Sequence, residues 1–214
     1  MKTAMDRILP VSAPLVRRAL LPYKARRRAQ FAALPDSSGR VVFLGDSITQ
    51  FGMWEELFPD LSTSNRGING DTVGDVIARV DDALRSPRVV SVMIGTNDLH
   101  GLGPSTSPAV IASQIGELIA VLHDLVPRVP LILNSVTPRS PLFTLRIRDL
   151  NARCARLADG AGVRFVDLWP TFADGDGAIR PELTMDGIHL SPAGYNAWAK
   201  ALRPALDEAL SAST

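Results

Sequence analysis

The sequence predicts an α/β domain built on a parallel β-sheet, and two observations support this prediction. Short apolar runs alternate with helical patterns along the chain, and several of these runs are almost continuously apolar. Continuous apolar strands are typical of a parallel sheet that helices cover on both faces. The alternation of strand and helix implies right-handed crossover connections. The expected strands are residues 40–44, 61–65, 89–94, 131–136 and 163–168.

Helices are predicted where apolar residues recur every three or four positions. A first helix over residues 23–34 leads into the first strand. The apolar stripes of the later helices are Val73, Val76, Ile77, Val80 and Leu84; Ile111, Ile115, Leu118, Leu122 and Leu125; Ile147, Leu150, Cys154 and Leu157; and Tyr195, Trp198 and Leu202. Because Cys154 falls on one of these stripes, we interpret it as a core residue.

Capping residues and prolines indicate where these helices begin and end. Ser107-Pro108 and Ser191-Pro192 each place a capping residue directly before a proline that suits the first helical turn. Either Asp71 or Thr72 is expected to cap the helix that follows them. Pro204 is expected to break or kink the last helix, because proline lacks the N–H that the helix needs.

Length and composition indicate one globular domain. The 214 residues suit a single core, and 46% hydrophobic with 21% charged residues is typical of folded chains. No repeat or linker divides the chain, and residues 170–185, which contain glycines and proline, are expected to form a functional or covering loop. The net charge of +1 argues against a nucleic-acid partner.

Cysteine usage and hydropathy bear on the compartment. The single cysteine excludes an intramolecular disulfide framework and fits a reducing environment. No apolar stretch is expected to reach the roughly 20 residues that a membrane span needs. The expected location is therefore the cytoplasm, with export left open.

Residues 1–39 are predicted to form a basic arm and helix that pack on a single domain of residues 40–214. The basic residues of this arm are Arg17, Arg18, Lys24, Arg26, Arg27 and Arg28. One interpretation is attraction to an anionic membrane surface. The favoured interpretation is the solvated face of a helix, because acidic residues elsewhere balance the charge.

Four short polar segments stand beside the predicted strands and the last helix. Gly45-Asp46-Ser47 follows the first strand, residues 65–72 (NRGINGDT) follow the second, residues 95–98 (GTND) follow the third, and residues 186–190 (DGIHL) precede the last helix. Each has a simpler explanation alone, since Asn-Gly is most often a hairpin turn and Asn-Asp a loop or cap. Ligands bind beyond the carboxyl ends of parallel strands. We therefore expect the four segments to meet at one rim.

These segments together contain the parts of an acyl-transfer site. The Ser47 hydroxyl needs a neighbouring base to act as a nucleophile. Of the three histidines, His123 is expected on a helix surface, His100 beside the pocket, and His189 three residues after Asp186. That spacing lets the carboxylate accept a hydrogen bond from Nδ1–H of the imidazole, which leaves Nε2 free to face the serine.

An oxyanion would also find hydrogen-bond donors here. The backbone N–H of Ser47 stands at a helix start, Gly70 can offer a second N–H, and the Asn97 amide a third. No cluster has metal-ligand spacing and no glycine-rich phosphate loop is present in the sequence. The residues themselves therefore indicate neither a metal site nor a phosphate-binding cofactor loop.

The four segments resemble the conserved blocks of the SGNH (GDSL-type) hydrolases over residues 23–202. FLGDSIT, NRGINGDT and DGIHLSPAGY are most similar to the branch of platelet-activating-factor acetylhydrolase-type α subunits and related bacterial esterases. The resemblance implies a three-layer α/β/α sandwich around a mostly parallel five-stranded sheet, of the flavodoxin-like type. It implies Ser47 as nucleophile, His189 as base and Asp186 as its orienting acid, with no metal and no organic cofactor. Ser47, Gly70 and Asn97 would form the oxyanion hole, and Asp46 would have a structural role.

The function predicted from these residues is hydrolysis of a small carboxylic ester or thioester through an acyl-enzyme. The alternatives are a carbohydrate deacetylase or O-acyltransferase that uses the same site, and a non-catalytic binding module, which the intact set of residues disfavours. A homodimer is possible for relatives of this branch. The residues that could line the acyl pocket, or equally pack in the core, are Phe51, Trp54, Leu99, His100, Phe143 and Met185.

Overall fold

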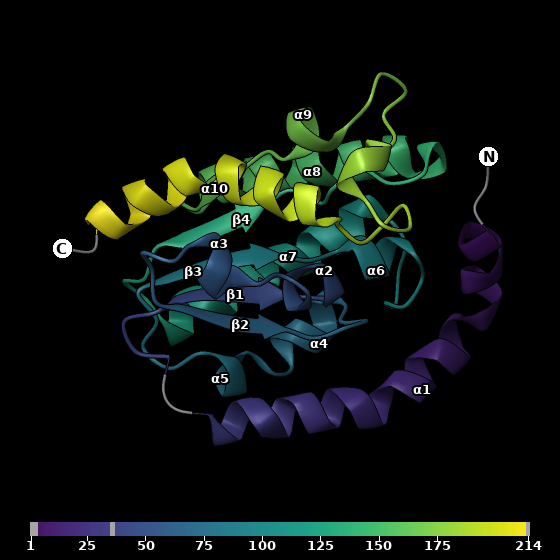
Figure 1. Ribbon diagram of the computed structural model, residues 1–214. Helices are drawn as coiled ribbons and strands as arrows, with labels where there is room; N and C mark the ends of the chain where they lie inside the picture. The colour runs from purple at the N-terminus through teal and green to yellow at the C-terminus, as the bar shows by residue number, and fades with distance from the viewer. Residues whose placement is uncertain (1–3, 35–36, 213–214) are drawn as a thin grey trace.

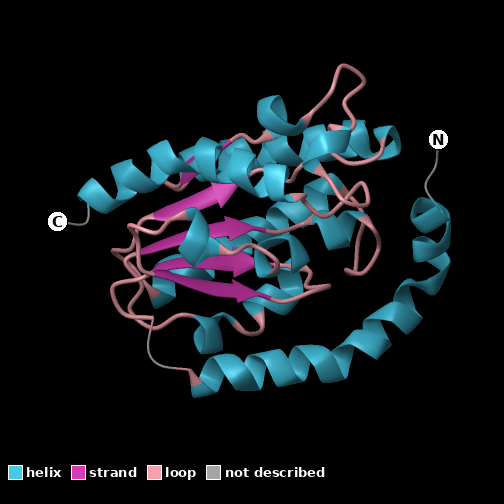
Figure 2. Ribbon diagram, viewed as in Figure 1, coloured by secondary structure: helices cyan, strands magenta, loops and turns pink. Residues whose placement is uncertain are grey.

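The chain forms a five-stranded parallel sheet between two layers of helices (Figures 1 and 2). The computed structural model describes residues 4–34 and 37–212, and only the backbone of residues 4–13. The strands are β1 Val41–Gly45, β2 Thr63–Gly67, β3 Val89–Met93, β4 Leu131–Asn134 and β5 Arg164–Val166. They lie in the order β2-β1-β3-β4-β5, and every neighbouring pair is parallel. The predicted α/β fold and its five strands are confirmed.

Helices and turns connect the strands. The long helices are α1 Ala4–Ala33, α7 Pro108–Leu125, α8 Thr144–Gly160 and α10 Pro192–Ala212. The short ones are α2 Ser47–Gln50, α3 Trp54–Leu57, α4 Val73–Ile77, α5 Val80–Ala83, α6 Thr96–Leu99, α9 Trp169–Phe172, and the 3-10 turns η1 Pro141–Phe143 and η2 Pro181–Leu183.

The two faces of the sheet bury alternate residues, as the pleat of a strand requires. In β1, Val41 and Phe43 belong to an apolar cluster with residues of α3, α9 and α10. Val42 and Leu44 belong to the opposite cluster, with residues of α4, α5, α7 and α8. Cys154 lies in this second cluster as its stripe predicts, and burial raises the pKa of its thiol to about 12.

The stripe from residue 73 to residue 84 forms two short helices, α4 and α5, instead of the single predicted helix. Thr72 rather than Asp71 is the cap: its hydroxyl accepts the N–H of Asp75, whose carboxylate in turn accepts the N–H of Thr72. The helix is interrupted at Arg79, where φ is −137°. The guanidinium of this residue is turned into the molecule, where it donates to the Gly45 and Arg66 carbonyls.

Prolines interrupt helices less than the sequence predicts. α10 continues through Pro204. Proline has no N–H to donate to the Lys200 carbonyl, but both residues are exposed, so water can bind this carbonyl instead. The first helix starts at Ala4 rather than at residue 23 and continues through Pro14 and Pro22. It curves around one side of the molecule (Figure 1).

Two further segments differ from expectation. Residues 170–185 contain most of α9 and the η2 turn, and the Asp174 carboxylate closes the tip by accepting the N–H groups of Asp176 and Ala178. α7 is long and apolar enough, by length and composition alone, to cross a membrane, contrary to the expectation that no stretch qualifies. Its apolar face is buried in the core, with Ile111, Ile115 and Leu118 each almost inaccessible to water.

Candidate active site

The junction of β1 and α2 places a serine hydroxyl in a cavity at the carboxyl edge of the sheet. Ser47 is the first residue of α2, and Asp46 caps this helix by accepting the N–H of Ile48 at 2.9 Å. Burial raises the pKa of Asp46 to about 7, although the hydrogen bond from Ile48 opposes the shift. Asp46 thus fixes the turn between β1 and α2, which places the Ser47 side chain at the carboxyl edge of the sheet.

Ser47, His189 and Asp186 form a hydrogen-bonded chain. The Oγ of Ser47 lies 3.0 Å from Nε2 of His189, and Nδ1 of the same ring lies 2.7 Å from Oδ2 of Asp186. The other carboxylate oxygen accepts the backbone N–H groups of Ile188 and His189. Gly187, directly after Asp186, has a φ of +87°, a value that favours glycine. The chain therefore reverses tightly and brings the His189 ring and the Asp186 carboxylate together.

The carboxylate of this chain is held in its charged form. Burial alone would raise the pKa of Asp186, but hydrogen bonds from the side chain and backbone of His189 outweigh burial and lower it. A charged acceptor holds the hydrogen on Nδ1, which leaves Nε2 able to accept the Ser47 proton. The tautomer is thus assigned from the hydrogen-bond partners of the ring.

The expected oxyanion donors line the same cavity as the serine and histidine. This cavity has a volume of about 170 Å³, and Ser47, Gly70, Asn97 and His189 are among its lining residues. Gly70 has a φ of +77°, a backbone conformation that favours glycine at this position of the cavity wall. The Asn97 amide donates to the carbonyl of Asp71 at 2.9 Å, so it is fixed at the cavity wall.

A buried ionic network supports the loop that carries Gly70. The Nε of Arg79 donates to Asp71 at 2.6 Å, and both side chains are almost fully buried. Lys24 of α1 lies 3.2 Å from the same carboxylate. Removing one partner of such a buried pair leaves an uncompensated charge, which costs several kcal/mol. The loop is therefore held rigidly against β1 and α1.

A family model described as GDSL-like lipase/acylhydrolase matches residues 43–197. The chain belongs to this family. It is 30% identical over 183 residues to the platelet-activating factor acetylhydrolase IB subunit alpha1 of Bos taurus, which covers 80% of this chain and 76% of the relative. The resemblance stated from the four polar segments is confirmed, and the chain is a hydrolase of the SGNH type.

Solved structures agree with this family. A Streptococcus structure named for platelet-activating factor superposes with a TM-score of 0.81 at 25% identity, covering 92% of this chain and 98% of its own. A GDSL-like lipase from Bacteroides thetaiotaomicron superposes with a TM-score of 0.71 at 26% identity, covering 87% and 98%. The α/β fold is thus that of the GDSL/SGNH hydrolases.

The six expected pocket residues lie in three different environments. His100 lines the 170 Å³ cavity, and Phe143 packs edge-on against its ring at 4.8 Å. Phe51 and Met185 instead line a second, apolar groove of about 440 Å³, where the Phe51 ring lies 5.4 Å from that of His189. Through Phe51, this groove lies beside His189.

Trp54 and Leu99 lie in the core and not at a pocket wall, so of the two alternatives left open for them the core is the right one. Trp54 stacks on Phe43 with ring centroids 3.9 Å apart, and its Nε1 donates to the Thr49 carbonyl. Leu99 is 1% exposed and belongs to the cluster that contains α7 and α8. Both side chains therefore stabilise the fold beneath the site.

Other cavity residues were missed in the sequence. They are Val16, Leu20, Asn69, Leu102, Arg139 and Ile188. Arg139 is 2% exposed and donates to the carbonyl and hydroxyl of Thr96. The signal for Val16 and Leu20 was their spacing of four residues from each other and from Lys24, which puts them on one helix face.

Within the residues that the structure describes, no three His, Cys, Asp or Glu side chains group in a way that could hold a metal ion. His123 lies in the last turn of α7, apart from the residues that line the cavity. The chemistry available at this rim is that of a hydroxyl, an imidazole, a carboxylate and hydrogen-bond donors, with the Arg139 guanidinium also in the cavity wall.

Proposed function

We propose that this chain is a serine esterase that hydrolyses a small carboxylic ester or thioester through an acyl-enzyme on Ser47. The observation that carries the proposal is the continuous chain from Ser47 Oγ to His189 Nε2 at 3.0 Å and from Nδ1 to Asp186 Oδ2 at 2.7 Å. Hydrogen-bond reach between nucleophile, base and orienting acid is the geometry that activates a serine.

The proposed mechanism has two symmetric halves. His189 takes the Ser47 proton as Oγ attacks the ester carbonyl, and the resulting imidazolium protonates the leaving alcohol or thiol. The N–H groups of Ser47 and Gly70 and the Asn97 amide stabilise the oxyanion. Water then gives its proton to His189, attacks the acyl-enzyme and releases the acid, while the proton returns to Ser47 Oγ.

The related subunits are named acetylhydrolases, which favours a small acyl ester as the substrate. The small size of the cavity around Ser47 supports the same choice, since pockets for drug-sized ligands occupy roughly 300–1,000 Å³. Hydrolysis rather than transfer is the proposed outcome, with water as the acceptor.

The test is turnover of p-nitrophenyl acetate together with labelling by a fluorophosphonate probe. Ser47→Ala should lose nearly all turnover and all labelling, while His123→Gln, a histidine remote from the cavity, should retain both. Wild-type turnover by the Ser47→Ala variant would refute the assignment. Formation of an acylated sugar instead of free acid, when sugars are supplied, would favour the O-acyltransferase.

A further inference from the structure

The N-terminal helix α1 contributes to the wall of the active-site cavity. It precedes the residues that the family model matches, which begin at residue 43. Val16 and Leu20 are one helical turn apart, so both side chains lie on the same face of α1, and both line the cavity that contains Ser47. Leu15 and Leu21, their neighbours in sequence, are 73% and 55% exposed.

Leu20 packs directly on Gly70, one of the expected oxyanion residues. A Cβ atom built at Gly70 would collide with Cδ1 of Leu20, so glycine and leucine are in close contact. The side chain therefore lies over the loop that donates to the oxyanion. An ester whose carbonyl oxygen is bound by the oxyanion donors therefore has its acyl chain next to Leu20. A long chain must pass this side chain, whereas a short chain ends before it.

Polar contacts hold α1 firmly at this position. The Lys24 ammonium donates to the Gly70 carbonyl and to Asp75, each at 2.8 Å, although Lys24 is only 8% exposed. The Tyr23 hydroxyl donates to Gln50 Oε1, which also accepts the N–H of Asn69 at 2.8 Å. Lys24 thus binds the loop around Gly70 directly and Tyr23 binds it through Gln50, so these contacts hold the helix and the loop together.

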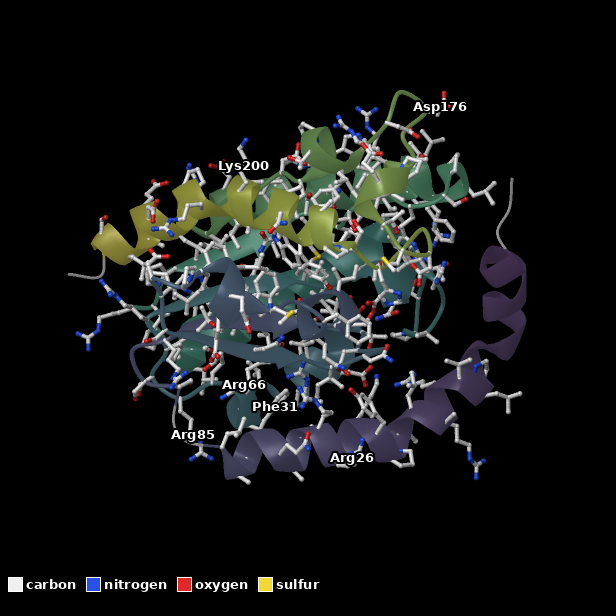
Figure 3. The ribbon with its side chains drawn as sticks, in the orientation of Figure 1. Arg26, Phe31, Arg66, Arg85, Asp176 and Lys200 are labelled. Carbon is white, nitrogen blue, oxygen red and sulfur yellow. The ribbon has the colours of Figure 1, made fainter. Side chains whose placement is uncertain are left out.

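The end of α1 nearest β1 is also anchored. Phe31 is 4% exposed, and the guanidinium of Arg66 lies 5.1 Å from its ring centroid; Figure 3 shows both side chains between α1 and the body of the molecule. Arg28 forms an ion pair with Asp82 at 2.9 Å. These contacts keep the helix from acting as a loosely attached arm.

We propose that Leu20, supported by Val16, is a specificity-determining residue that limits the length of the acyl group, so that the substrates are esters of short acids. This inference rests on the proposed function. Leu20 is one of the residues that line a cavity of about 170 Å³, together with the serine, the histidine and the expected oxyanion donors. The open groove beside Phe51 and Met185 adjoins the ring that protonates the leaving group, so the alcohol departs on that side.

The test compares p-nitrophenyl acetate, butyrate and hexanoate, which differ only in the acyl group. Leu20→Ala should raise the kcat/KM ratio of hexanoate to acetate by about tenfold or more, since one methylene in an apolar pocket changes kcat/KM by roughly 10–200-fold. Leu20→Trp should lower that ratio further below wild type. Leu21→Ala is the matched control and should keep the wild-type ratio.

Two results would overturn the inference. The first is an unchanged ratio in both Leu20 variants while fluorophosphonate still labels Ser47. The second is a raised ratio in Met185→Ala with no change in Leu20→Ala, because the acyl chain would then lie in the groove. Absence of any ester turnover and of labelling in the wild-type chain would instead refute the proposed function itself.

Discussion

Replacement of Asp186 by asparagine tests the hydrogen-bonded chain most directly. Oδ1 of Asp186 accepts two backbone N–H groups and Oδ2 faces Nδ1 of His189 at 2.7 Å. The amide oxygen of Asp186→Asn can keep the backbone bonds, which leaves its NH₂ group facing the ring. A donor in that place favours the tautomer with hydrogen on Nε2, and Nε2 can then no longer take the Ser47 proton.

The size of the effect follows from the exposure of the carboxylate. In a fully buried triad the same change lowers kcat about 10⁴-fold. The Asp186 side chain is 40% exposed, so water can partly replace it as the acceptor of Nδ1–H. We therefore expect kcat to fall by about 10²–10⁴, which is about 2.7–5.5 kcal/mol in activation free energy. KM should change little, because Asp186 is not among the cavity-lining residues.

The assay is kcat and KM for p-nitrophenyl acetate from pH 5 to 10, with the melting temperature measured on the same samples. Asp176→Asn is the control, since Asp176 lies at the tip of a loop that projects from the molecule (Figure 3). The melting temperatures of both variants should match wild type within a few degrees. If Asp186→Asn kept kcat within threefold of wild type, Asp186 would not orient His189 and the assigned chain would be wrong.

Three further predictions concern the oxyanion donor, a buried acid and the core. Asn97→Ala should lower kcat/KM by about 10²–10³ in single-turnover assays, and an unchanged rate would remove Asn97 from the oxyanion hole. Burial raises the pKa of Asp98 to about 7, although the hydrogen bond from the N–H of Val73 opposes the shift. Because folding favours the protonated form, Asp98 should make the wild-type protein less stable as pH rises from about 4 to 7, by on the order of 4 kcal/mol. The Asp98→Asn variant has no carboxyl group to ionise, so its melting temperature relative to that of wild type should increase between pH 5 and 8. A difference in melting temperature that stays constant over this range would contradict the raised pKa of Asp98. Trp198→Phe removes the indole Nε1 donor to the buried Asn134 Oδ1 and should lower the free energy of unfolding in urea by about 1–3 kcal/mol. A loss below about 0.5 kcal/mol would show that Asn134 finds another partner.

The meeting of the four polar segments was predictable because the topology leaves few choices. Strands that are all parallel place their carboxyl ends on one edge, so the loops after β1, β2 and β3 had to be neighbours. The short spacing from Asp186 to His189 limited where the carboxylate could reach. What the sequence did not show was the distance between Ser47 and His189, which depends on how residues 170–190 pack on α10.

The errors came from residues whose surroundings decide their role. Trp54 and Phe51 look equivalent in sequence, but only Trp54 stacks on Phe43 and donates to a buried carbonyl. The extent of α1 was underestimated, because Pro14 and Pro22 normally end a helix. The split at Arg79 arises from its contacts with distant carbonyls, which periodicity cannot reveal. Cytoplasmic location, the homodimer and the division at residue 39 stay predictions.

The separation of Ser47 from His189 by 142 positions affects the order in which the site is assembled during synthesis. Chains leave the ribosome from the N-terminus, so Ser47, Gly70 and Asn97 emerge well before His189. Under the proposed mechanism, a nascent or truncated polypeptide that ends before residue 186 lacks the base that activates the serine and is therefore inert. Ester cleavage would then begin only after the residues just before the last helix have been made.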